Sequence, residues 1–87
     1  MNVKFKDLKW ITKLNGSQAI LKFQNSYGVS VLFGEQFYSN GVNTFELAVL
    51  KNDFLHYENK IANGDVIGLL KKKELMKLIN EVKHLKK

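Results

Sequence analysis

Apolar and polar residues alternate along much of the first 58 residues, and a period of two is typical of half-buried β-strands. Glycine, asparagine and serine interrupt the alternation at short intervals, as turns do. The pattern predicts five strands, near residues 3–13, 18–24, 28–38, 43–50 and 54–58. Because the connections are short, consecutive strands should pair as antiparallel hairpins and form a meander.

The first predicted hairpin turns at Asn15-Gly16, because a two-residue type I′ turn needs two residues that tolerate positive φ. This turn sets Trp10 opposite Leu21. Both side chains then lie on one apolar face of the predicted sheet. We therefore expect a two-residue turn at this position.

The second asparagine-glycine pair, Asn40-Gly41, requires a different loop. A two-residue turn there would place Glu35 opposite Glu46, and like charges directly across a strand pair are destabilising. A three-residue loop at 40–42 instead pairs Phe33 with Val49 and leaves Glu35 facing Leu47. Three-residue loops at 25–27 and 51–53 extend the same apolar face and pair the following residues: Leu21 with Val31, Ala19 with Phe33, and Val49 with Leu55.

The C-terminal segment has a period of three to four, which predicts an amphipathic helix near residues 70–86. Two starts are compatible with the sequence: a helix that begins at the three lysines 71–73, or one that begins earlier with Asp65 as its cap. The fold class expected is α+β, a five-stranded antiparallel meander sheet packed by one C-terminal α-helix, in a single domain 1–87. The helical residues predicted to cover the sheet are Leu75, Leu78, Ile79, Val82 and Leu85.

A second set of apolar residues falls on the opposite face of the predicted sheet. One helix cannot cover both faces, so either the sheet curls strongly or this face meets another protein surface. We expect a candidate protein interface here, for a homodimer or for a host protein. Its members are Ile11, Ile20, Leu32 and Leu50.

Lysine accounts for all fourteen basic residues, and the formal net charge is +6. Seven of these lysines and only two glutamates occur in residues 71–87. Without arginine, bidentate reading of guanine edges is disfavoured, so any nucleic-acid binding should be non-specific. Alternatively, the lysines could form only a solvated face of a basic protein. We expect Phe5 and Trp10 to lie in the core and not among these lysines. The candidate anion or nucleic-acid face comprises Lys72, Lys73, Lys77, Lys83, His84 and Lys87.

Catalytic and metal-binding patterns are missing from the sequence. There is no cysteine, no nucleotide-binding or metalloprotease motif, and only two histidines, His56 and His84. We therefore expect no enzyme, no cofactor, no metal and no small-molecule substrate. No apolar run at the N-terminus predicts a signal peptide, and none is long enough for a membrane span, so we expect a cytoplasmic protein that does not enter a membrane.

Three segments together resemble a group of small phage and prophage proteins of unassigned role: Tyr27–Gly34, Phe45–Leu70 and the lysine-rich end of the C-terminal helix. The shared motifs are a YG-x-S-V strand, an E-L-A-V-L strand and a D-V-I-G segment before a C-terminal helix, and the resemblance spans roughly residues 27–82. It implies a viral or prophage setting, in the cytoplasm of a bacterial host, and no specific activity.

The chain departs from that group in two ways. It carries Lys71-Lys72-Lys73-Glu74 where the group has Thr-Glu-Glu-Glu, and the loop after Tyr38 is shorter. The sign of charge at the helix start is therefore reversed. From the sequence we expect a non-enzymatic accessory protein that binds another protein, such as a host or defence protein; the alternative is non-specific nucleic-acid binding by the lysine-rich helix.

Overall fold

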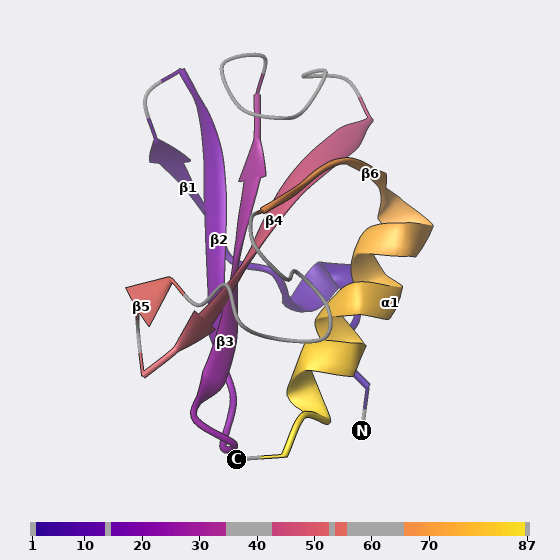
Figure 1. Ribbon diagram of the computed structural model, residues 1–87. Coiled ribbons are helices and arrows are strands. Elements are labelled where there is room, and N and C mark those ends of the chain that lie inside the picture. The colour runs from indigo at the N-terminus through magenta and orange to yellow at the C-terminus, as the bar shows by residue number, and fades with distance from the viewer. Residues whose placement is uncertain (1, 14, 35–42, 53, 56–65, 87) are drawn as a thin grey trace.

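The computed structural model describes residues 2–13, 15–34, 43–52, 54–55 and 66–86. An antiparallel sheet has the strand order β1-β2-β3-β4-β5, and a sixth strand, β6, also pairs with β4 (Figure 1). The helix α1 packs against β3, β4 and β6. The predicted α+β architecture is confirmed, with one strand more than expected. The elements are η1 (Phe5–Asp7), β1 (Trp10–Lys13), β2 (Gly16–Lys22), β3 (Tyr27–Phe33), β4 (Thr44–Lys51), β5 (Phe54–Leu55), β6 (Ile67–Lys71) and α1 (Lys72–Lys83).

The hydrophobic core lies between α1 and one face of the sheet, which we call the covered face. Leu75, Ile79 and Val82 of α1 are completely buried, as the helical period predicts, and Leu78 and Leu85 pack against them at the margin. On the sheet, the alternation of β2, β3 and β4 supplies the facing residues. They are Ala19, Val29, Val31, Phe45, Leu47 and Val49.

The observed registers differ from the predicted ones by even numbers of residues. Trp10 lies opposite Ala19 and not Leu21, because the first turn falls one residue earlier than expected, after Lys13 and before Gly16. Similarly, Val49 lies opposite Val29 and not Phe33. An even slip leaves every side chain on its predicted face, since strand side chains repeat every two residues. The pairings were therefore wrong, although the assignment of these strands' residues to faces was right.

The turn between β2 and β3 also lies one residue earlier than predicted. The N–H of Phe23 donates to the carbonyl of Tyr27 at 2.8 Å, which leaves three residues, 24–26, in the loop. Ser26 has a φ of 73°, the left-handed conformation typical of the last residue of such loops. Leu21 consequently pairs with Val29, where the sequence predicted Val31.

Only the short strand β5 is placed on the wrong face by the sequence. Leu55 pairs with Leu50, and Phe54 with Lys51, so the register differs by one residue from the predicted pairing of Leu55 with Val49. An odd slip reverses the faces, and Leu55 therefore lies away from the core. The remainder of the predicted strand, 56–58, and the predicted loop at 40–42 fall outside the described residues.

The segment before α1 is a strand, which the sequence analysis missed. In β6, Leu70 pairs with Phe45 and Ile67 pairs with Leu47, so three residues of β6 span two of β4. This β-bulge turns both Ile67 and Leu70 toward the core although they are three positions apart. Leu69 has a φ of 54° in the bulge. A spacing of three looks helical in the sequence, and the helix was therefore predicted to start two residues too early.

The N-terminal segment was predicted as one strand over 3–13 but forms η1 and the short strand β1. The carboxylate of Asp7 accepts the N–H of Lys4 at 2.8 Å and stabilises the 3-10 turn. The backbone of Val3 is held by α1, because the amide of Asn80 accepts from its N–H at 2.7 Å and donates to its carbonyl at 3.1 Å. This pairing brings the start of the chain alongside the helix (Figure 1).

Candidate functional site

The predicted apolar set lies on the sheet face opposite α1, which we call the outer face. Ile11 of β1 and Leu32 of β3 both pair with Gln18 of β2, one on each side of it. Ile20 lies two residues farther along β2, and Leu50 lies on β4 opposite Gly28. The structure thus places all four predicted residues on one face, and the reversed strand β5 adds Leu55.

The members of this set differ in accessibility. Ile11, Ile20 and Leu55 are 60%, 44% and 55% exposed, so each presents a large apolar side chain to the surroundings. Leu32 is half-buried, whereas Leu50 is buried and offers little surface for a contact. The accessible part of the predicted interface is therefore smaller than the sequence indicated.

Small residues occupy the middle of the outer face. Ser30 and Ala48 pair with each other across β3 and β4, and both are buried without belonging to the core between sheet and helix. The side-chain N–H of Gln18 donates to the hydroxyl of Ser30 at 2.9 Å, across the strand pair. The larger apolar residues Ile20 and Leu32 flank this pair. The outer face is therefore inaccessible at its middle and exposed at Ile11, Ile20 and Leu55.

The lysine-rich set is only partly a solvated face. Lys72, Lys73, Lys77 and His84 are exposed, whereas Lys83 is half-buried, and Lys87 lies outside the described residues. Asn80, which the helical period places on the same polar stripe, is engaged with Val3 and with the carbonyl of Met76. The accessible positive charge is consequently concentrated toward the N-terminal half of α1.

The helix starts at the three lysines, which excludes the alternative start near Asp65. Lys71 is the N-cap residue, and an ammonium group cannot accept a hydrogen bond from the first-turn amides. Glu74 reaches back instead, and its carboxylate accepts the N–H of Lys71 at 3.1 Å. The lysines therefore surround a helix N-terminus whose partial positive charge they do not offset.

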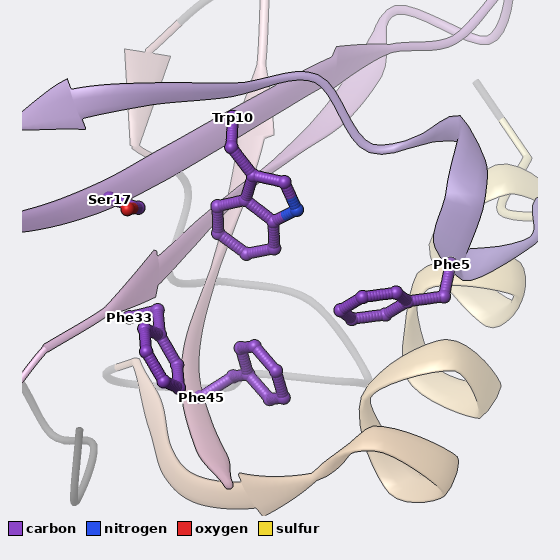
Figure 2. A pocket seen from close by; sticks show the side chains of 5 residues that line it. All are labelled: Phe5, Trp10, Ser17, Phe33 and Phe45. Atoms are coloured by element: carbon purple, nitrogen blue, oxygen red, sulfur yellow. The ribbon is translucent and has the colours of Figure 1, made fainter. Parts of the chain in front are cut away.

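An open pocket of about 310 Å³ lies beside the helix start and was not predicted from the sequence. Its lining residues come from five successive segments of the chain, and Figure 2 shows four aromatic rings around a common space with a serine at its edge. We call it the aromatic pocket. It is lined by Phe5, Trp10, Ser17, Phe33 and Phe45.

Phe45 is the central ring of this pocket. Its centroid lies 5.7 Å from that of Phe5, 5.9 Å from that of Trp10 and 5.2 Å from that of Phe33. These separations are those of favourable aromatic pairs. Phe45 is buried, whereas its three neighbours are only half-buried and retain accessible ring surface. Phe5 and Trp10 pack against the core, as expected, but they are only partly buried.

The pocket and the lysine-rich set meet at one residue. The ammonium nitrogen of Lys72 lies 4.5 Å from the centroid of the Phe5 ring, within the range of a cation–π contact. Because Phe5 and Lys72 are far apart in sequence, the folded chain alone brings an aromatic surface next to the basic helix. In the sequence, the only indication of this aromatic pocket was the presence of large aromatic residues on the predicted apolar face.

Among the residues that the structure describes, no three histidine or acidic side chains are grouped so that they could hold a metal ion. The described part of the chain also contains no helix with the length and apolarity that a membrane crossing requires. His56, one of the two histidines, lies outside the described ranges.

Comparison of the chain with protein families, with curated proteins and with solved structures finds no match.

Proposed function

We propose that this protein is a non-enzymatic binding protein whose outer sheet face docks onto another protein. The observation that supports this proposal is the exposure of Ile11, Ile20 and Leu55 on a single face of the sheet. Isolated apolar residues on a surface are ordinary, but several exposed ones on one face of a sheet are typical of an interaction site. The opposite face is already occupied by α1.

The resemblance to small phage and prophage proteins supplies a setting for this proposal. In that setting the partner is a host protein in the bacterial cytoplasm, including a protein of a defence system, and the chain acts by occupying its surface. A second copy of the chain is the other occupant that the outer face could take. The size and oligomeric state of the complex distinguish these two occupants.

The test is a charge introduced at an exposed apolar position of the outer face. Ile20→Glu places a carboxylate at a position that is 44% exposed, so the fold should tolerate it while an apolar contact there should not. Phe54→Glu is the matched control, because Phe54 is 76% exposed and its pairing with Lys51 places it on the other side of the sheet. Circular dichroism establishes that both variants are folded.

Sedimentation equilibrium of the purified chain, followed by affinity capture from host extract, then reads the interaction. We expect a dimer or a captured protein that Ile20→Glu loses and Phe54→Glu retains. A chain that is monomeric, and whose two variants capture the same proteins as the wild type, would remove the outer face as the interaction surface.

A second function is favoured by a separate observation, the three exposed lysines Lys72, Lys73 and Lys77 near one end of α1. They would attract the phosphate backbone of nucleic acid without reading its sequence. The test is fluorescence anisotropy of labelled oligonucleotides at low and at physiological salt. We expect an affinity that falls steeply with salt, and no binding even at low salt would refute this function.

A further inference from the structure

We propose that the aromatic pocket stacks an unpaired base of single-stranded nucleic acid while Lys72 contacts the adjoining phosphate. This inference deepens the second function above and rests on it. The juxtaposition that carries it is an open aromatic surface bordered by a lysine ammonium, 4.5 Å from the Phe5 ring centroid. Proteins that bind single strands combine the same two elements, aromatic rings for the bases and positive charge for the backbone.

The size of the pocket and its aromatic lining suit one ring system. Trp10, Phe33 and Phe5 surround Phe45 and keep accessible surface, and Figure 2 shows the indole of Trp10 projecting from β1 into the space between the phenylalanines. A volume of about 310 Å³ is at the small end of ligand sites, which span roughly 300–1,000 Å³. One ring system is therefore accommodated more readily than a large ligand.

The polar groups around the pocket bear on whether it could distinguish one base from another. Among the lining residues that the structure describes, Ser17 contributes a hydroxyl at the rim, and the chain has no arginine to bind a base edge through two hydrogen bonds. We therefore expect little preference among bases. A duplex should bind less well than a single strand, because its bases are stacked on each other and cannot enter the pocket.

Lysine positions favour an anionic ligand over a neutral apolar one. Lys71, Lys72 and Lys73 are all exposed where the helix begins, and residues 71–87 hold seven lysines against two glutamates. A neutral aromatic or aliphatic group would gain from the rings alone and would leave this charge unused. Charge complementarity thus indicates the phosphate backbone as the second half of the ligand.

Trp10 is the only tryptophan in the chain, so its fluorescence reports on the pocket directly. The experiment titrates the full chain with a short oligo(dT) strand, with the same strand carrying abasic sites, and with a duplex of equal length. We expect oligo(dT) to quench Trp10 and to bind about tenfold more tightly than the abasic strand, the scale of one stacked base. Equal binding of both strands with unchanged fluorescence would overturn the stacking proposal and leave the lysine contacts standing.

Single-residue variants distinguish the contribution of the pocket to binding from that of the helix lysines. Phe33→Leu keeps an apolar side chain but removes one ring, and we expect it to weaken oligo(dT) binding by about tenfold and leave abasic binding unchanged. Phe54→Leu is the matched control, because Phe54 is 76% exposed and does not line the pocket. Lys72→Gln should weaken both strands. Failure of every strand to bind at low salt would refute both the nucleic-acid function and the pocket, whereas equal effects of Phe33→Leu and Phe54→Leu would refute the pocket alone.

Discussion

The two faces of the sheet are built from the same strands by the same alternation of side chains. They differ in what covers them, because α1 packs on only one of them. On the covered face, Val29, Val31 and Leu47 are inaccessible, because α1 lies over them. On the outer face, Ile11 and Ile20 remain exposed, although Ser30 and Ala48 in the middle of that face are buried. The difference shows that apolar character assigns a residue to a face, whereas the helix decides which face becomes the core.

The two faces also differ in how they respond to errors of register. The covered face keeps its composition when a strand slips by two residues, since another apolar residue takes each place. The outer face mixes large, small and polar residues, so a change of register changes which side chains lie next to each other on its surface. Stability should therefore depend most on the covered face, and recognition on the outer one.

The largest expected effect is on the covered face, from Leu47→Ala. Leu47 is completely buried between β3, β6 and the helix, so its truncation leaves a cavity and should lower the free energy of unfolding by about 2–5 kcal/mol. Urea denaturation measures it. Leu55→Ala is the control on the outer face and should cost less than about 0.5 kcal/mol. Similar losses from the two variants would contradict the division into a core face and an open face.

The next effect concerns the contact that holds the end of α1 on the covered face. The side-chain amide of Asn25, in the β2–β3 loop, donates to the carbonyls of Val82, Lys83 and Leu85 at 2.8–3.1 Å. Its oxygen accepts the N–H of Tyr27 at 3.0 Å. These carbonyls belong to the last turn of the helix and its exit, where the regular helical hydrogen bonds end, although that of Val82 also accepts the N–H of Leu85 at 3.1 Å.

Asn25→Ala should therefore lower the free energy of unfolding by about 1–3 kcal/mol, the cost of leaving partly buried polar groups without their partner. Thermal denaturation followed by circular dichroism measures it. Gln24→Ala, an exposed neighbour in the same loop, serves as the control and should change stability little. If the two variants were equally stable, the loop would not be what fixes the helix end.

The sequence predicted the faces of β2, β3 and β4 correctly because alternation is local. It failed at β5, where a turn one residue shorter reversed Leu55, and at β6, where a bulge gave a strand the spacing of a helix. Both failures come from single extra or missing residues. A pattern of apolar positions cannot detect them, because either count leaves an apolar residue at a plausible place.

The aromatic pocket could not be predicted from the sequence for a different reason. Phe33 and Phe45 were expected on one face, but whether their rings close against each other or leave a space depends on the packing of η1. The proximity of Lys72 to Phe5 likewise depends on where the helix begins. The outer set was predicted more fully, since it required only the strand phase; its buried member, Leu50, could not be distinguished from its exposed ones.

A smaller effect is expected at the bulge, which turns both Ile67 and Leu70 to the covered face. Leu69 adopts a φ of 54° there, and a leucine in the left-handed region costs about 1–2 kcal/mol. Leu69→Asn should recover up to about 1 kcal/mol, because asparagine tolerates this conformation and Leu69 is 64% exposed. Leu69→Val should instead destabilise, as a β-branched residue fits the region poorly. Chemical denaturation of the pair measures the difference, and a more stable valine variant would contradict the bulge geometry.

The smallest expected effect is on the outer face itself, from Ile11→Thr. Ile11 is 60% exposed on the edge strand β1, and threonine retains its β-branched shape, so the stability of the monomer should change by less than about 0.5 kcal/mol.

Denaturation of the wild type and of Ile11→Thr at two protein concentrations tests whether the outer face binds a second copy of the chain. If the outer face binds a second copy, wild-type stability should rise with concentration and the variant's should rise less, since binding adds to the stability of the folded state. If neither depends on concentration, the face is free in the isolated chain and its occupant is a different protein. A loss of 2 kcal/mol or more at both concentrations would show that Ile11 is packed within its own chain, and the contrast between the two faces would then be wrong.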